Sequence, residues 1–323
     1  MMAAQTSPAA MVDVGLGDLS WQAHPEVWTL IVGIVGIGWF VAKVVQPKAI
    51  AAGLGPVSRA HKTWFLAAAG SLWVASDWPI HDVAEEYLYF VHMAQHLFIS
   101  MLIPGMLIKA MPSWLFDLVI PTNSRAWRWL LQGSKPLVAG LLFNGLTSIL
   151  HWSRVVQLSF DSGAAHYVMH LAIFASGLLM WMPVIGPVKE WRIAPLTQCV
   201  YLFLMSVVPT VPSAWLIFAE DVVYKHYGNA DRLWGVGVLS DQQLAGVVMK
   251  LVGGFFLWGV IVVIFARWAR ADGRNNEAER NARGAARFAA AKAKSGIVDA
   301  ETLTYDDVAG EFAKHDPIHE PTV

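Results

Sequence analysis

Seven long apolar stretches, separated by short polar segments, dominate the hydropathy pattern of this chain. About 20 mostly apolar residues in an α-helix cross a bilayer core, so each stretch predicts a transmembrane helix. Neither the alternation typical of strands nor coiled-coil heptads occurs over a useful length. The pattern predicts an all-α polytopic membrane helix bundle of about seven transmembrane helices, at residues 27–45, 63–80, 86–108, 136–153, 164–185, 195–218 and 242–266.

The composition favours a membrane protein over a soluble enzyme. Hydrophobic residues make up 56% of the 323 residues and charged residues only 15%, whereas soluble domains carry roughly 25% charge. So few charges do not cover a water-facing surface. The 16 tryptophans are typical of aromatic belts at several membrane interfaces. We therefore expect the lipid bilayer as a partner and no nucleic acid.

Charged residues are sorted by loop. Basic residues fall in alternate loops and after the last stretch, whereas the intervening loops are acidic or mixed. Because loops rich in Lys and Arg stay in the cytoplasm, this alternation predicts an outside N-terminus and a cytoplasmic C-terminus. The basic residues are Lys43, Lys48, Arg59 and Lys62, then Lys109, Arg125, Arg128 and Lys135, then Lys189 and Arg192, and finally Arg267, Arg270, Arg274 and Arg280.

Three regions are expected along the chain. Residues 1–25 lack the basic start and apolar core of a signal peptide and are expected to form an outer segment. Residues 26–270 are expected to form the seven-helix membrane domain. Residues 271–323 begin Ala- and Arg-rich and become acidic, which is typical of a solvated cytoplasmic tail, partly helical or disordered. A basic helix that binds the membrane surface or a partner is the alternative.

Histidines are concentrated at one depth of the predicted bundle. His92 and His96 are four residues apart in the third stretch. His166 and His170 repeat that spacing in the fifth, so each pair shares a helix face. His151 ends the fourth stretch. In the predicted orientation all five lie toward the outer leaflet.

These histidines predict a metal site. Ionisable residues inside spans are costly and usually face the bundle interior with a partner, and neutral imidazole suits copper, zinc and iron. A single such histidine is more often a hydrogen-bonding residue than a ligand, but two pairs plus a fifth favour a ligand cluster. His81 adds an imidazole in the adjoining outer loop. Thioethers favour Cu(I), although each nearby methionine (Met93, Met101 and Met169) packs more often than it binds metal.

Lys250 lies in the middle of the last stretch. A charge there is costly unless it is paired or faces water. A functional role, as an ion pair or in a proton path, and a purely structural partner are equally open for this residue.

Five motifs in this order resemble the CtaG family, multi-pass membrane proteins associated with the assembly of caa-type cytochrome c oxidase. They are HMAQHLF (His92 to Phe98), Pro104, His151–Trp152, HYVMH (His166 to His170) and DQQLAGVVM (Asp241 to Met249). The resemblance covers roughly residues 25–270 and implies a role in building a copper-containing oxidase. The family's functional positions would map onto His92, His96, His151, His166, His170, Asp241 and Gln242.

Two positions depart from the family pattern. Lys250 follows Met249, where an aromatic residue is usual, and His151 is followed by Trp-Ser-Arg instead of spaced Pro and Tyr. Both departures leave a variant role open. A cysteine-based copper chaperone of oxidase assembly shares the family's name, but the single cysteine, Cys199, excludes a paired Cys motif.

The resemblance and the histidines together predict a non-enzymatic assembly factor for haem–copper cytochrome c oxidase in the bacterial inner membrane. It would bind copper from the outer side and have oxidase subunits as partners. The alternatives are a b-haem electron-transfer protein with haem as its cofactor, a metal transporter, and a seven-span photoreceptor with Lys250 as its Schiff base. The inner half has no histidines for a second haem or an exit path, and no carboxylate lies mid-span as a counter-ion for Lys250. Copper handling is therefore favoured.

Overall fold

The chain divides into two compact units, residues 1–265 and residues 266–323. The computed structural model describes residues 13–15, 19–228, 232–295, 305–306 and 309–310. Much of the predicted outer segment (residues 1–25) and the end of the predicted tail (residues 271–323) lie outside these described residues.

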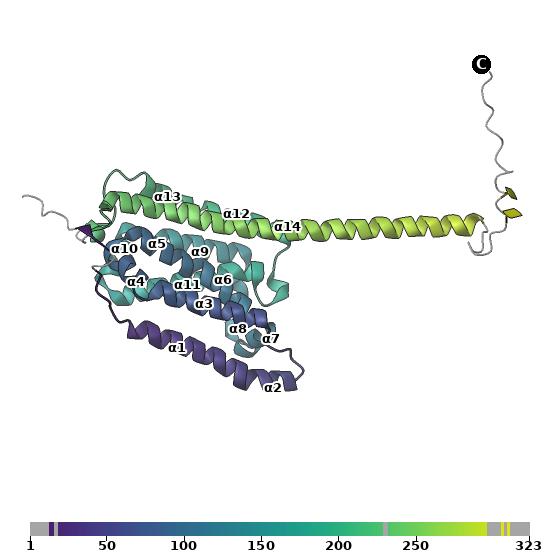
Figure 1. The fold of residues 1–323 in the computed structure, drawn as a ribbon, viewed down its shortest axis with the longest axis horizontal. Coiled ribbons are helices and arrows are strands. Elements are labelled where there is room, and N and C mark those ends of the chain that lie inside the picture. Colours follow the sequence, from purple (N-terminus) through teal and green to yellow (C-terminus); the bar gives the residue numbers. More distant parts are fainter. Residues whose placement is uncertain (1–12, 16–18, 229–231, 296–304, 307–308, 311–323) are drawn as a thin grey trace, which may run out of the picture. The chain divides into compact units, whose positions relative to one another are not determined.

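Helices form nearly all of the first unit (Figure 1). Pro25, Pro136 and Pro195 stand in first turns, where the missing N–H costs no helical hydrogen bond. The α-helices are α1 (Pro25–Phe40), α2 (Gln46–Ala51), α3 (Arg59–Ser76), α4 (Ile80–Asp82), α5 (Tyr89–Leu97), α6 (Ile103–Ala110), α7 (Ser113–Val119), α8 (Arg125–Gly133), α9 (Pro136–Leu150), α10 (Ser153–Asp161), α11 (Gly163–Ile185), α12 (Pro195–Val207), α13 (Thr210–Ile217) and α14 (Val238–Ser295).

Shorter elements join these helices. Among the described residues, the π-helical segments η2 (Val41–Val45), η3 (Val83–Tyr87) and η4 (Phe98–Leu102) precede α2, α5 and α6, and the 3₁₀ turns are η5 (Lys189–Trp191) and η6 (His226–Gly228). Two two-residue strands, β1 (Asp13–Val14) and β2 (Arg232–Leu233), pair in parallel. The predicted all-α class is confirmed, and this strand pair is a local tie between the N-terminal segment and the loop before α14.

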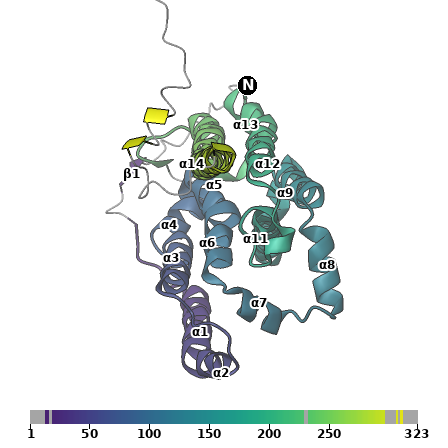
Figure 2. The ribbon, with the colours of Figure 1, turned by 90° about the vertical axis from the view of Figure 1, so that its right-hand side faces the viewer.

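The long helices lie side by side, as Figure 2 shows end-on. Helix α3 packs against α6, α6 against α11, and α11 against α9, while α1 packs against α3. One contact is unusually close: a Cβ on Gly177 of α11 would overlap the carbonyl oxygen of Ser100 in η4. Only glycine allows this approach, which is how small residues bring transmembrane helices together. This contact packs α11 closely against the continuous helix that α5, η4 and α6 form.

The polar and apolar residues are arranged as in lipid. Large side chains that face outward include Val32, Leu141 and Phe255, whereas Asn144 and Ser213 are buried inside. In water, apolar surface spread over so many helices would be an aggregation liability. In a bilayer the same surface would contact the acyl chains, so the first unit has the outer surface expected of a helical membrane bundle.

Two of the seven predicted spans lack the length or hydropathy of a membrane crossing, which leaves five candidate spans among the described residues. Five helical stretches of the described chain are long and apolar enough to cross a membrane: Pro25–Ala51, Tyr89–Ala110, Gly163–Ile185, Pro195–Ile217 and Val238–Ala291. Helix α9 has 15 residues, about 22 Å of helix against a bilayer core of about 30 Å. Helix α3 begins with Arg59, His61 and Lys62, so its apolar part is short.

The second unit contains the end of α14, which runs to Ser295. Its surface is charged, with Glu279 Oε2 and Arg283 Nη2 forming an ion pair of 3.0 Å one turn apart. Such i, i+4 pairs favour an exposed helix. The boundary at residue 271 and a cytoplasmic location stay predictions.

Candidate metal centre

Helix α5 carries the first histidine pair. Leu88 is extended and ends the preceding π-turn, so α5 starts afresh at Tyr89. Its first N–H groups have no partner within the helix. The carboxylate of Asp241 supplies one, accepting the N–H of Tyr89 at 2.9 Å and that of Phe90 at 3.0 Å. A fixed helix start fixes His92 one turn further on.

Helix α11 carries the second pair. The Ser162 hydroxyl caps it by accepting the N–H of Ala165 at 3.3 Å, as N-cap serines do. His166 and His170 follow on one face, with ring centroids 4.3 Å apart. On α5 the rings of His92 and His96 are 4.4 Å apart.

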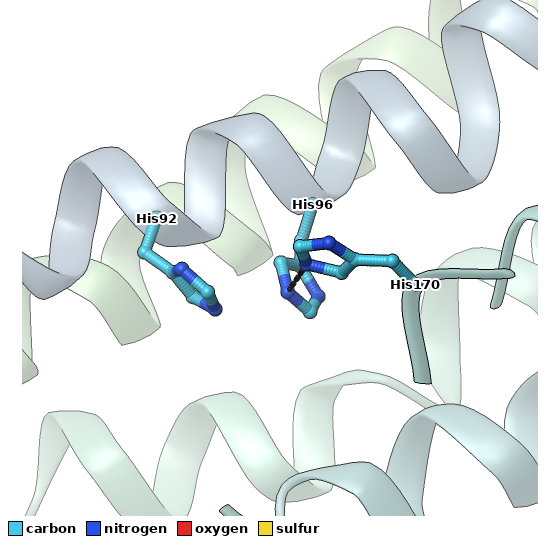
Figure 3. A group of neighbouring side chains, drawn as sticks. All are labelled: His92, His96 and His170. Carbon is cyan, nitrogen blue, oxygen red and sulfur yellow. Dashed lines mark hydrogen bonds between the residues drawn. The ribbon is translucent and has the colours of Figure 1, made fainter. Parts of the chain in front are cut away.

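Three of the predicted ligands converge. Possible ligand atoms of His92, His96 and His170 all lie within 4.8 Å of one another. Figure 3 shows His92 and His96 projecting from the same side of α5, with His170 reaching toward His96 from the other helix. The Nε2 atoms of His96 and His170 are 2.9 Å apart. Three imidazoles this close form a group that can hold one metal ion.

The other two histidines border the same space. His166 and His151 line, together with His92, His96 and His170, one cavity of about 30 Å³. That volume holds a single water or ion. The structure therefore brings together all five span histidines predicted from the sequence, with three as the tight group and two at its edge.

Glu85, which lies just before the third predicted span, is a site residue that the sequence pattern did not indicate. Its Oε1 lies 3.0 Å from His92 Nδ1 and 3.4 Å from His166 Nε2. A carboxylate on the far nitrogen of a ligand histidine fixes the ring and increases its basicity. Glu85 precedes His92 by seven residues, but the extended Leu88 interrupts the helix between them, so this spacing carried no usable signal.

The charge of Glu85 persists over the physiological range. Burial alone would raise the pKa of its carboxyl, but His92, His166 and His81 outweigh burial and lower that pKa to about 2. A permanent negative charge therefore borders the cluster and favours a cation there.

His151 is held from two sides. Its Nδ1 lies 2.6 Å from the carbonyl oxygen of Thr147 and its Nε2 lies 3.4 Å from Met93 Sδ. Its own carbonyl accepts the hydroxyl of Tyr224 at 2.7 Å. Burial raises the pKa of Tyr224 to about 12, so this hydroxyl keeps its proton and stays a donor.

His81 lies outside the tight group. Its Nδ1 is 3.3 Å from Gln95 Nε2, and its ring meets that of His24 edge to face at 5.1 Å. His24 Nε2 in turn lies 2.7 Å from Asp82 Oδ1. The structure thus places His81 in a neighbouring polar cluster that ties the N-terminal segment to α4.

Asp241, Gln242 and Lys250 hold the scaffold. Asp241 and Gln242 are fully buried, and Asp241 caps α5. The Gln242 side-chain amide accepts the N–H of Tyr224 and donates to the carbonyl oxygen of the same residue. Lys250 Nζ donates to the hydroxyl of Thr210. The Asp-Gln pair therefore acts on the histidines through the backbone, without facing them.

Two ring nitrogens of the cluster have no hydrogen bond. Within the described part of the chain, these are the buried His96 Nδ1 and His166 Nε2, although His166 Nε2 lies 3.4 Å from Glu85 Oε1. An orphaned buried nitrogen is costly and is frequent where a ligand or ion belongs. Imidazoles, an adjacent carboxylate and a cavity of ionic size together fit a metal centre.

Comparison with known proteins gives relatives of unassigned role. Uncharacterised proteins of Mycobacterium bovis and Mycobacterium tuberculosis are each 26% identical over 204 residues, which cover 58% of this chain and 31% of the relative. One of Mycobacterium leprae is 23% identical over 266 residues, 73% of this chain and 40% of the relative. The chain thus spans less than half the length of these relatives. No solved structure matches it.

A family comparison is more informative. The model of the cytochrome c oxidase caa3 assembly factor family matches residues 38–271. This range contains every histidine of the cluster, Glu85 and the buried Asp241–Gln242 pair, and it confirms the family predicted from the motifs. The chain belongs to the family of cytochrome c oxidase caa3 assembly factors.

Proposed function

We propose that this protein is a non-enzymatic assembly factor of the bacterial cell membrane that holds copper for a haem–copper oxidase. The observation that carries the proposal is the convergence of His92, His96 and His170 beside the ionised Glu85. Membership of the assembly-factor family indicates that the client is a cytochrome c oxidase, and we expect its subunits to be the partners. Imidazole binds copper well, and copper is the metal that the client requires.

The site dimensions favour a small ion over a haem. A haem iron held by two axial histidines keeps their nitrogens about 4 Å apart, at roughly 2 Å per bond. His96 Nε2 and His170 Nε2 are 2.9 Å apart, and the shared cavity measures about 30 Å³. A macrocycle does not fit between these rings without moving α11 away from α5.

We propose further that the chain crosses the membrane seven times, with α3 and α9 as short spans, and that its N-terminus is outside. The segments at one end of the bundle, near α2, α7 and α8, are those with the basic residues of the alternate loops. Helices α4 and α10 lie at the opposite end of the bundle (Figure 1). The positive-inside rule places the basic end in the cytoplasm. The histidine cluster, which adjoins α4 and α10, then lies in the outer leaflet.

Metal analysis of detergent-purified protein tests the copper site. The wild type should bind one equivalent of Cu(II) or Zn(II) at the histidine trio, and His92→Ala/His96→Ala should bind none. His61→Ala is the matched control, because His61 stands at the basic end of α3, where its Nδ1 accepts the N–H of the N-cap Ser58. Full metal retention in the double variant would contradict the proposal.

A deletion strain tests the assembly role. Loss of the protein should lower haem–copper oxidase activity at limiting copper while the oxidase subunits are still made. Wild type and His61→Ala should restore activity, whereas a stably inserted His92→Ala/His96→Ala should not. A deletion strain with fully active, copper-replete oxidase would rule out the assembly role.

A further inference from the structure

We infer that Met93 and His151 form a second, softer metal site next to the histidine trio, selective for a monovalent d¹⁰ ion such as Cu(I). This inference rests on the proposed copper-handling function and deepens it. It begins from an unusual contact: the Nε2 atom of His151 lies 3.4 Å from the thioether sulfur of Met93, and both residues are buried.

The hydrogen bond on the other side of His151 determines what this contact is. Nδ1 lies 2.6 Å from the carbonyl oxygen of Thr147. A carbonyl only accepts, so Nδ1 carries the proton of the neutral ring. Nε2 therefore presents a lone pair toward Met93, whose sulfur also presents lone pairs. Two acceptors face each other with no proton between them, and a cation supplies what is missing.

The spacing suits such a cation. With bonds of about 2.0 Å to nitrogen and about 2.3 Å to sulfur, as for the d¹⁰ ion Zn²⁺, a separation of 3.4 Å gives an angle of about 105° at the metal. That is near the tetrahedral value which d¹⁰ ions adopt. Neither side chain has to move.

Further donors surround the position. A second cavity of about 50 Å³ is lined by His96, Met93 and His151 and also by Met101, Met205 and Met249. The Thr147 hydroxyl lines it too. Thr147 is more than nine-tenths buried, and the structure gives its Oγ1 no hydrogen-bond partner among the described residues. The thioether sulfurs are soft donors and, like the hydroxyl, they carry no charge, so the site favours Cu(I) over Zn²⁺ or Cu²⁺.

Lys250 adds to this selectivity. It lines the same cavity, with Nζ donating to Thr210. The repulsion that an ammonium exerts on an ion doubles when the ion's charge doubles. A divalent ion is therefore penalised more than a monovalent one, whereas Glu85 favours the higher charge at the histidine trio. The two sites thus differ in both donor softness and charge.

Met93, His96 and His151 line both cavities, so they form the wall that the two sites share. A Cu(I) ion bound by imidazoles of the trio therefore meets the Met93–His151 pair next, without a change of oxidation state. This arrangement provides ligand exchange over a short path inside the bundle.

Metal binding to the purified full chain in detergent tests the inference. Ag(I), which is redox-inert, probes the soft site, and Zn(II) probes the trio. Met93→Leu keeps the apolar volume and removes the sulfur. It should lose one equivalent of Ag(I) or weaken its binding at least 10-fold, and it should retain Zn(II). Met180→Leu is the control, because Met180 is equally buried and lines neither cavity.

X-ray absorption of the Cu(I)-loaded protein gives a second readout. Wild type should show a sulfur scatterer in addition to nitrogen, and Met93→Leu should lose or reduce it. Unchanged Ag(I) binding in Met93→Leu would overturn the soft site, as would a joint loss of Ag(I) and Zn(II), which would mean one shared site. Failure of His92→Ala/His96→Ala to lose Zn(II) would instead overturn the proposed trio, so the two failures are distinguishable.

Discussion

The Asp241 carboxylate, at the start of α14, accepts the backbone N–H of Tyr89, the first residue of α5, at 2.9 Å across 152 positions of sequence. The last long helix thereby fixes the start of the helix that presents His92 and His96. A family motif that looks like a site of its own is instead a support for the histidines.

Replacing Asp241 tests this support. Asp241→Ala leaves the N–H groups of Tyr89 and Phe90 without their acceptor in a buried place. The free energy of unfolding should fall by about 1–3 kcal/mol, and metal should bind more weakly because His92 is no longer held. Thermal unfolding in detergent and metal titration measure both. Asp161→Ala is the control, since Asp161 accepts from Gln157 on an exposed surface; equal effects of the two variants would contradict the role of Asp241.

Glu85→Gln should weaken divalent-metal binding at the trio about 10-fold or more, because the charge beside His92 and His166 is lost. The folded pKa of Glu85 is about 2, lowered from 4.5. Its charge is therefore complete above about pH 4.5 and is lost only as the pH falls toward 2. The difference between wild type and variant should persist from pH 8 to pH 5.

Across that range both proteins should lose metal as the pH falls, because protons compete for imidazole, whose unperturbed pKa is about 6.5. Metal titrations at several pH values check this. Glu86→Gln is the matched control, since the Glu86 carboxylate is bonded by Gln22. If Glu85→Gln binds metal like Glu86→Gln, the carboxylate does not support the site.

Reporter fusions test the orientation. Fusions after Glu86 and Arg154 should report outside, and a fusion after Val323 should report inside, because the basic loops stay in the cytoplasm. Alkaline phosphatase and green fluorescent protein activities measure this in cells. A periplasmic C-terminus would move the histidines to the inner leaflet and contradict the proposed direction of copper entry.

The helices and the histidine pairs could be predicted because both are local. Apolar stretches mark helices, and an i, i+4 spacing places His92 beside His96 on any helix. The number of spans was less certain because length decides it, and His151 ends α9 after only 15 residues. Periodicity does not show where a helix of apolar residues stops.

Three features could not be predicted from the sequence, because each depends on packing or on a break in the helix. Glu85 reaches His92 only because η3 and the extended Leu88 interrupt the helix between them. Asp241 caps a helix 152 residues away. Met93 and His151 meet only when α5 packs against the end of α9. Sequence spacing carries no signal for contacts of this kind.

Gly177 offers a test of how helix packing controls the site. A Cβ there overlaps the Ser100 carbonyl oxygen, which is backbone and cannot turn away. Gly177→Ala must therefore push α11 off η4, at a cost of about 1–3 kcal/mol. His170 stands two turns from Gly177 on α11, so its Nε2 should move away from His96 and metal affinity should fall.

Gly145→Ala on α9 is the control: nothing lies within 4 Å of its added Cβ, and alanine favours a helix by up to about 1 kcal/mol. In thermal unfolding, Gly177→Ala should therefore be less stable than wild type and Gly145→Ala at least as stable. In Zn(II) titrations, only Gly177→Ala should bind metal more weakly. If Gly177→Ala keeps both stability and affinity, α11 does not rest on Ser100.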